Sequence, residues 1–322
     1  MKQNILITSV GQRVVLTEIF QKSIKEFGLH SKIYSADLNP SMAPAGFISD
    51  HCFPICRCTK PEYIEELIAL CKKNDIGIIV PTIDTELLVL SQHEMQFRAE
   101  GIQVMVSAPD FIKMCRDKRK TMVLFDSLDI HYPRLLDKQA PVFPMFAKPY
   151  DGSLSTNLHI IRKPDDLTSD ILNDEKLIFT EYIDTTDFKE FTVDMYYGKD
   201  NRVKSIVPRE RIKIRAGEIN KGITRRNAIV NYLKERMDYL PGVIGTICIQ
   251  LFYREEDRRI YGIEINPRFG GGYPLSYWAH ANFPGNIIRE YLLGEDIDYS
   301  EEWTSNTLML RYDREVIVYD AQ

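Results

Sequence analysis

The chain has 322 residues and a formal net charge of -5, and 44% of its residues are hydrophobic. This length allows two or three domains with sizeable cores. The acidic balance argues against a dedicated nucleic-acid-binding protein, which usually carries a basic excess. No apolar run approaches the roughly 20 residues that span a bilayer, and the first residues lack a signal-peptide pattern. We therefore expect a cytoplasmic protein that contacts neither nucleic acid nor membrane.

The first hundred residues alternate between strand and helix patterns. Strands are expected at 4–10, 31–37, 76–82 and 102–107, and helices at 13–27, 61–73 and 86–100. Apolar strands that alternate with helices indicate a parallel sheet covered on both faces. Its first turn, "TSVGQR", has one glycine where a dinucleotide fingerprint has three, so NAD binding is not indicated.

The pattern changes after Pro109, where a helical stretch with a basic cluster occupies 110–130. Strands are then expected within 141–161, at 176–183, 188–197, 202–216, 242–254 and 258–267, and again within 307–319. This order predicts a largely antiparallel α+β region.

Three cysteines, Cys52, Cys56 and Cys58, follow His51 closely. Their spacing lacks the paired C-x2-C of zinc knuckles, so reduced structural thiols are favoured over a metal site.

The stretch "YGIEINPRFGGGYP" carries the main chemical signal. Glu264 and Asn266 are two residues apart, so on a strand both side chains project from one face. Adjacent carboxylate and amide oxygens suit Mg²⁺, and Arg268 could neutralise a phosphate oxygen. A hairpin through "EEDRR" would bring Gln250 to the same face as a further ligand. The alternative is an acid and an amide on a solvated strand edge.

Two lysines upstream fit the same ligand. Lys148 ends an apolar strand and precedes the Gly/Ser-containing "PYDGSLSTN", so it is placed to meet phosphate. Lys118 lies in the basic helical stretch, where a solvated helix face is the alternative. In "FTEYIDTTDFKEFTVD", Glu181 and Ile183 close a strand whose backbone could bond an adenine edge, and Glu190 could accept ribose hydroxyls; a surface hairpin carrying acids is the alternative here.

Taken in order along the chain, these residues resemble the ATP-grasp superfamily, and within it the carbamoyl-phosphate-synthase-like proteins. The resemblance implies a pre-ATP-grasp parallel α/β domain at 1–110 and a two-lobed ATP-grasp domain at 111–322, with a mobile lid at roughly 121–183. It implies that Lys118 and Lys148 hold the ATP phosphates, and that the loop with Gly152 and Ser153 closes over them.

The resemblance also assigns the remaining motif residues. Glu181 and Ile183 would contact adenine and Glu190 the ribose. Glu264 and Asn266, with Gln250, would bind Mg²⁺ (or Mn²⁺). Arg268, together with Lys148, would stabilise the transferred phosphoryl group.

The activity implied is that of an ATP-dependent ligase, which converts a carboxylate to an acyl phosphate for attack by an amine or another nucleophile. Two alternatives stay open, namely carboxyphosphate chemistry like that of carbamoyl phosphate synthase and a non-catalytic ATP-binding module. Full carbamoyl phosphate synthesis is not expected, because the chain has one ATP-grasp unit and no glutamine-hydrolysing domain. The partners implied are small-molecule substrates, and the family allows a homodimer.

Substrate recognition has one sequence signal. In "RERIKIRAGE" strand alternation would place Arg209, Arg211, Lys213 and Arg215 on one face. That face could bind an anionic substrate, or it could be a solvated edge strand decorated with cations. Arg311 is the other candidate for the substrate pocket.

Overall fold

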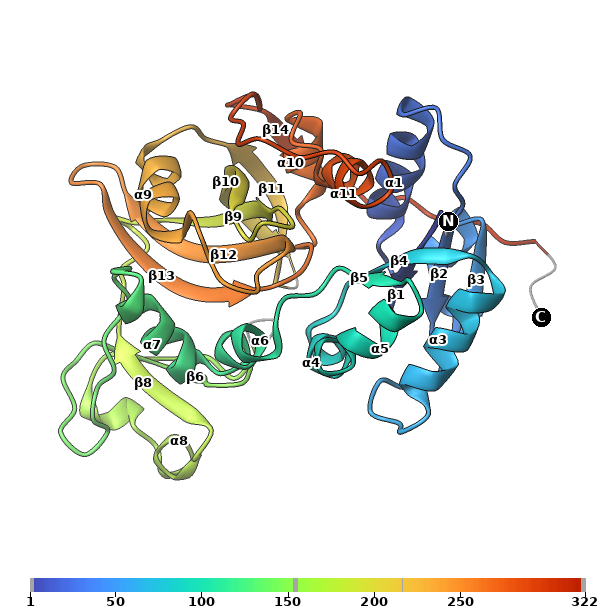
Figure 1. Ribbon diagram of the computed structural model, residues 1–322. Helices are drawn as coiled ribbons and strands as arrows, with labels where there is room; N and C mark the ends of the chain where they lie inside the picture. Colours follow the sequence, from blue (N-terminus) through green and yellow to red (C-terminus); the bar gives the residue numbers. More distant parts are fainter. Residues whose placement is uncertain (1–2, 153–155, 216, 320–322) are drawn as a thin grey trace.

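The computed structural model describes residues 3–152, 156–215 and 217–319. Its strands form a parallel sheet of five, an antiparallel sheet of three and an antiparallel sheet of six (Figure 1). The expected fold class, a parallel α/β domain followed by a mixed α+β region, is confirmed.

The five-stranded sheet is built from the N-terminal third of the chain and has the order β3-β2-β1-β4-β5. Its strands are β1 (Asn4–Thr8), β2 (Ile33–Asp37), β3 (His51–Pro54), β4 (Ile76–Pro81) and β5 (Gln103–Val104). The helical segments between them are α1 (Val14–Glu26), η1 (Pro40–Met42), α2 (Pro44–Ile48), α3 (Tyr63–Lys73), α4 (Asp84–Gln92) and α5 (Glu94–Ala99).

Strand alternation divides this domain into two apolar layers. Ile5 and Ile7 of β1 are fully buried in one layer with Phe20 of α1, whereas Leu6 is buried in the other layer with Leu67 of α3. Burial on both faces explains why these strands read as continuous apolar runs. The α1 layer continues into the core of the six-stranded sheet, so the two parts of the chain share one hydrophobic cluster.

Two helices lead out of the N-terminal domain, α6 (Pro109–Arg116) and α7 (Lys118–Ser127). They are separate because Asp117 has extended backbone and caps α7, its carboxylate accepting the Arg119 N–H at 3.0 Å. Lys118 therefore begins a helix instead of lying within one.

The three-stranded sheet has the order β7-β6-β8, with β6 (Met145–Pro149) at its centre between β7 (His159–Ile161) and β8 (Leu177–Glu181). Its own small core contains Met145, Ala147 and Phe179. The short segments η2 (Pro164–Asp166) and α8 (Ser169–Asn173) connect β7 to β8. Figure 1 shows this sheet set apart from the six-stranded sheet.

The six-stranded sheet has the order β13-β12-β9-β10-β11-β14. Its strands are β9 (Lys189–Tyr197), β10 (Val203–Arg215), β11 (Glu218–Thr224), β12 (Gly245–Arg254), β13 (Arg259–Asn266) and β14 (Leu308–Leu310). Three helices accompany it, α9 (Ala228–Met237), α10 (Pro274–Trp278) and α11 (Phe283–Tyr291).

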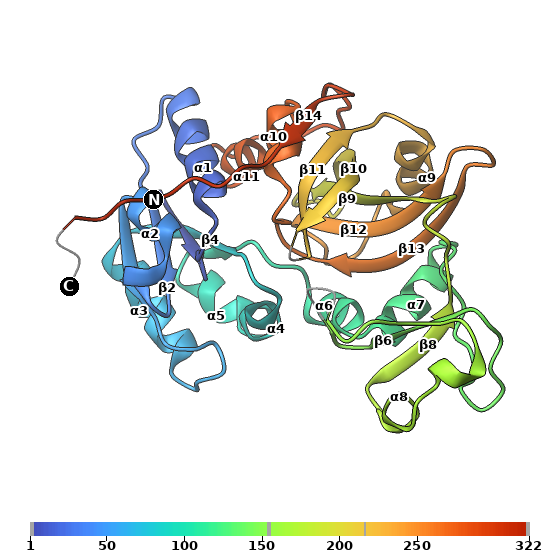
Figure 2. The ribbon, with the colours of Figure 1, turned by 180° about the vertical axis from the view of Figure 1, so that it is seen from behind.

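Three further sequence-based expectations need correction. The helix expected at 86–100 is interrupted at His93 and forms α4 and α5. The terminal strands expected within 307–319 reduce to β14, after which the chain leaves the sheet and runs back past the N-terminal domain (Figure 2). Two strands, β3 and β11, were not predicted.

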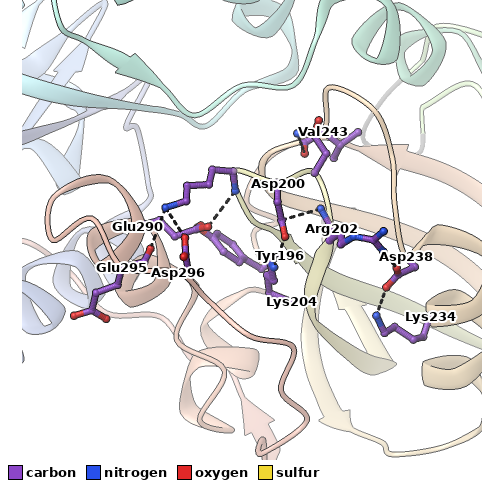
Figure 3. Close-up of polar contacts among 12 residues, drawn as sticks. Tyr196, Asp200, Arg202, Lys204, Lys234, Asp238, Val243, Glu290, Glu295 and Asp296 are labelled. Carbon is purple, nitrogen blue, oxygen red and sulfur yellow. Dashed lines mark hydrogen bonds and ion pairs between the residues drawn. The ribbon is translucent and has the colours of Figure 1, made fainter.

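Helix α11 is attached to the sheet by a buried carboxylate. Glu290 accepts hydrogen bonds from the Tyr196 hydroxyl and from the Lys199 N–H at 3.0 Å (Figure 3). Burial raises the pKa of Glu290. The neighbouring pair of Lys204 and Asp200, 2.7 Å apart, lies beside it, with Asp200 exposed and the Lys204 side chain mostly buried. These bonds give the cluster a structural role, since they attach α11 to the six-stranded sheet.

Candidate active site

A cavity of about 630 Å³ lies where the three sheets meet. Its walls come from the loop after β4, from β6 and β8, and from β9, β10, β12 and β13. A volume of this size is typical of a site for a small molecule or cofactor.

The predicted hairpin of β12 and β13 is present and forms one wall. The strands are antiparallel, and their register sets Gln250 opposite Glu264 and Cys248 opposite Asn266. All four residues line the cavity, and the Asn266 amide donates to the Glu264 carboxylate at 3.0 Å. The carboxylate and both amides therefore converge, as strand alternation predicted.

This donor set fits a hard divalent cation. One carboxylate and two amide oxygens are ligands that Mg²⁺ accepts when phosphates and water complete its shell. Within residues 3–152, 156–215 and 217–319, no three His, Cys, Asp or Glu side chains gather as a metal cluster, and Cys52, Cys56 and Cys58 are free thiols. A metal at Glu264 would accordingly depend on oxygens supplied by its ligand.

Both predicted lysines lie beside this group. The Lys118 ammonium is 3.4 Å from the Glu264 carboxylate and donates to the Gly152 carbonyl at 2.7 Å. Lys148 is only 6% exposed. Burial, and then the positive charge of Lys118, lower the pKa of Lys148 to about 8, although Glu264 opposes the shift. Lys118 is thus not on a solvated helix face.

The loop after Lys148 is described in part. Gly152 lines the cavity, and a side chain there would lie 2.9 Å from the Pro149 Cβ. Ser153, which was assigned to the same loop, lies outside the described residues.

The end of β8 forms the opposite rim of the cavity. Glu181, Tyr182 and Ile183 line it. The Glu181 carboxylate faces Arg134, whose Nε donates to it at 2.7 Å, and the Glu181 N–H bonds to the Arg134 carbonyl at 2.9 Å. The Glu181 side chain therefore already has Arg134 as its partner. At this rim, the backbone of Ile183 is the group left to contact a ligand.

Glu190 and Arg211 face one another across β9 and β10. The Arg211 Nε is 3.3 Å from the Glu190 carboxylate, and Arg211 also donates to the Gly217 carbonyl at 3.0 Å. Burial raises the pKa of Glu190, Arg211 opposes that shift, and the negative charge of Glu264 adds to it. Glu190 is not a surface acid.

The predicted common face of arginines is wrong. β10 lies between β9 and β11, so it is not an edge strand, and its register with β11 shifts after Arg211. Arg209 is 1% exposed and donates twice to Asp194, at 2.7 and 2.8 Å. Arg215 instead pairs with Asp313 at the surface and does not line the cavity. Only Arg209 and Arg211 reach the cavity from this strand.

Arg311 is also absent from the cavity lining. Its guanidinium holds the Glu218 carboxylate at 2.7 Å, and it donates to the Gly271 carbonyl. Burial opposes ionisation of Glu218, but Arg311, Arg13 and Arg268 together outweigh it and lower the pKa of Glu218. Arg311 therefore keeps an ionised carboxylate in the cavity wall.

Arg268 is held by a residue that sequence reasoning missed. Its guanidinium is 2.6 Å from the Asp84 carboxylate, which belongs to the N-terminal domain. Its Nε is buried without a hydrogen-bond partner among the described residues. The two residues are 184 positions apart, so no local spacing in the sequence could have indicated this pair.

Two of the three glycines after Arg268 make room for charged side chains of the protein itself. A Cβ on Gly271 would lie 2.2 Å from the Glu218 carboxylate, and one on Gly272 would lie 2.3 Å from the Arg209 guanidinium. The absence of a Cβ at Gly271 and Gly272 therefore lets these two side chains approach the backbone closely.

Comparisons with known proteins identify the two parts of the chain. Residues 5–105 match the family model of the PylC-like N-terminal domain, and residues 173–313 match the model described as ATP-grasp in the biosynthetic pathway with Ter operon. The chain is an ATP-grasp protein. No curated protein sequence matches it.

The match to solved structures with the ATP-grasp fold covers nearly the whole chain. A biotin carboxylase domain of 2-oxoglutarate carboxylase from Hydrogenobacter thermophilus, in complex with MgADP, ADP and bicarbonate, has a TM-score of 0.70 at 15% identity, and the match covers 95% of this chain and 73% of that one. N5-carboxyaminoimidazole synthetase from Staphylococcus aureus, complexed with ADP, has a TM-score of 0.67 at 15% identity, over 96% and 80% of the two chains.

An L-amino acid ligase from Bacillus licheniformis has a TM-score of 0.65 at 17% identity, over 90% of this ATP-grasp chain and 74% of that one. Identities this low establish the fold, and the narrower likeness to carbamoyl phosphate synthase stays a prediction. None of the helices in the described part of the chain is both long and apolar enough to cross a membrane.

Proposed function

We propose that this ATP-grasp protein is an ATP- and Mg²⁺-dependent ligase that activates a carboxylate as an acyl phosphate and transfers the acyl group to an amine or another nucleophile. The observation that carries the proposal is the convergence of Lys118, Lys148, Gln250, Glu264 and Asn266 in one cavity. Two cations beside an acid–amide group suit a triphosphate and its metal better than any other common ligand.

Each residue then has a role that its contacts support. Lys118 and Lys148 bind the phosphates, and Gly152 lies in the loop that covers them. Ile183 and the Glu181 backbone bond the adenine, and Glu190 accepts the ribose hydroxyls. The Glu264 carboxylate, with the amide oxygens of Asn266 and Gln250, would hold Mg²⁺, which would neutralise phosphate charge when bound.

The reaction needs positioning and charge neutralisation more than a protein nucleophile. In the first step a carboxylate oxygen of the substrate attacks the γ-phosphorus, the bond to the β-phosphate oxygen breaks, and ADP leaves. In the second step the amine nitrogen attacks the acyl carbon, inorganic phosphate leaves, and the amine loses a proton. Lys148 and Arg268 carry positive charge toward the phosphoryl group in both steps.

The buried side chains of Arg209 and Arg211 line the wall next to this site. Of the two, Arg211 contacts a residue proposed to bind the nucleotide, Glu190. We assign Arg211 to the ligand side of the cavity through its pairing with Glu190, 3.3 Å away. Arg209 donates to Asp194 through Nε and one terminal nitrogen, along one edge of its guanidinium, and acts as a support for the wall. The lid, at roughly 121–183, carries Lys148 and would bring it onto the phosphates.

Trapping with hydroxylamine tests the proposal without knowledge of the nucleophile. Hydroxylamine is a small strong nucleophile that converts acyl phosphates to hydroxamates. The protein is incubated with Mg-ATP, hydroxylamine and a panel of carboxylic acids, and both hydroxamate and ADP are measured. We expect acid-dependent formation of both products in equal amounts.

The other readings give different results in the same assay. ADP formation that needs bicarbonate alone, without hydroxamate from any organic acid, would favour carboxyphosphate chemistry. Binding of Mg-ATP without turnover on any acid would favour a non-catalytic ATP-binding module.

A further inference from the structure

The N-terminal domain contributes one cation to the cavity that the proposed ATP site does not use. Arg13 follows β1 and precedes α1, and it lines the cavity together with Thr82 and Asp84, which follow β4. β1 and β4 are parallel neighbours in the sheet, whose strand order is β3-β2-β1-β4-β5. The chain adds β2 and β3 on one side of β1 and then β4 and β5 on its other side, so the order of strand addition reverses between β1 and β4. In open α/β sheets, ligands bind outside the carboxyl ends of the strands at such a switch point.

Arg13 differs from its neighbours because no carboxylate binds it. Arg209, Arg211 and Arg268 each have an acidic partner, at 2.7, 3.3 and 2.6 Å. For Arg13, the described residues supply no carboxylate within ion-pair distance, and its side chain makes one long hydrogen bond, 3.4 Å to the Thr82 carbonyl. Arg116 has no ion pair among the described residues either. It lies two residues before Lys118, however, and so belongs to the side of the cavity proposed for the nucleotide.

The surroundings of Arg13 are unfavourable for a cation in the ligand-free protein. Burial and the like charge of Arg268 lower its pKa, while Glu218 and Asp84 oppose the shift. A guanidinium stays protonated even so. A partly buried cation without a bonded anion is less stable than a paired one, and an anionic ligand would supply the missing partner.

The contacts along the cavity give Arg13 a place relative to the reacting groups. Lys118 lies 3.4 Å from Glu264 of β13. Arg268 follows β13 and reaches Asp84, 2.6 Å away, in the segment after β4. Arg13 contacts Thr82 in the same segment. Arg268 therefore connects the groups that would hold the γ-phosphate with the segment beside Arg13.

We propose that Arg13 binds a second anionic group of the acid substrate, separate from the carboxylate that is activated beside Arg268. This inference rests on the proposed ligase function. The substrate class it names is a dicarboxylate, or another acid with an additional anionic group, whose far end reaches the switch point of the N-terminal sheet. Arg13 is thus a specificity-determining residue on the PylC-like domain.

The test compares wild type with Arg13→Gln and Arg13→Lys in the hydroxylamine assay. The probes are succinate, glutarate and adipate, with butyrate, valerate and caproate as monoacids of matched length. We expect wild type to use at least one diacid with a lower KM than its matched monoacid. Arg13→Gln should raise that KM at least about tenfold and leave the KM for ATP unchanged. Arg13→Lys should recover the activity only in part, since lysine cannot bind a carboxylate in the bidentate manner of arginine.

Arg215→Gln is the matched control, since Arg215 pairs with Asp313 at the surface, outside the cavity; it should change neither KM. A thermal shift with Mg-ATP verifies that each variant is folded and binds nucleotide. If wild type turns over acids but prefers monoacids, or if Arg13→Gln keeps the KM of wild type, the role of Arg13 is refuted and the ligase function stands. If wild type forms no hydroxamate from any acid, the ligase function fails and this inference fails with it.

Discussion

Replacing Lys148 with methionine is expected to stabilise the ATP-free protein and to abolish its response to ATP. Lys148 ends β6 and is 6% exposed, with Lys118 as a like-charged neighbour. Methionine keeps the unbranched shape and removes the charge. The variant therefore separates what the ammonium does for the fold from what it does for the ligand.

The magnitude follows from the pKa of Lys148, which falls from 10.5 to about 8 in the fold. Each pKa unit corresponds to about 1.4 kcal/mol, so the protonated side chain destabilises the ATP-free protein by about 3 kcal/mol relative to the neutral one. At pH 7, Lys148→Met should raise the free energy of unfolding by up to that amount.

The pH dependence has a defined sign. Between pH 8 and 10.5 the unfolded chain still binds the proton of Lys148 while the folded protein has released it, so wild type gains stability with rising pH. The advantage of Lys148→Met should accordingly shrink across this window. Denaturant unfolding of both proteins at pH 7 and at pH 10 measures it, and Lys163→Met, at an exposed position, is the control with no expected effect.

Ligand response completes the test. Mg-ATP stabilises a native state that binds it, so wild type should show a higher melting temperature with Mg-ATP, and Lys148→Met should not. The reasoning is refuted if Lys148→Met is less stable than wild type at pH 7, or if the difference between the two proteins is the same at pH 7 and pH 10.

Further predictions concern the other walls of the cavity. Mg-ATP should raise the melting temperature of wild type in a thermal shift assay, and NADP should not. Glu264→Gln keeps the side-chain shape and removes the charge, so hydroxamate formation should fall by orders of magnitude while the circular dichroism spectrum is retained; normal turnover would remove Glu264 from the site. Asp84→Asn leaves the Arg268 cation without its anion, and denaturant unfolding should show a loss of about 3 kcal/mol. Gly272→Ala forces a Cβ against Arg209 and should cost about 1–3 kcal/mol, whereas an unchanged unfolding midpoint would show that the Arg209 side chain can move.

The sequence alone determined the features that depend on neighbouring positions. Burial on both faces of the N-terminal sheet gave continuous apolar strands, and this indicated a parallel α/β domain. The i, i+2 spacing of Glu264 and Asn266 placed both side chains on one face of a strand, and the short connection to the preceding strand brought Gln250 opposite them. Such inferences succeed because strand periodicity and hairpin pairing are local.

Tertiary structure decided which charges meet. The alternation of Arg209 and Arg215 suggested a common face, but sheet order made β10 an internal strand and a register shift directed Arg215 to the surface. The partners of Arg215 and Arg268 lie 98 and 184 positions away in the chain. The position of Arg13 at a switch point exists only once β4 has paired with β1. Pairings of this kind depend on strand order and domain contact, which hydrophobic periodicity does not encode, and so the substrate side of the cavity became visible only in the folded chain.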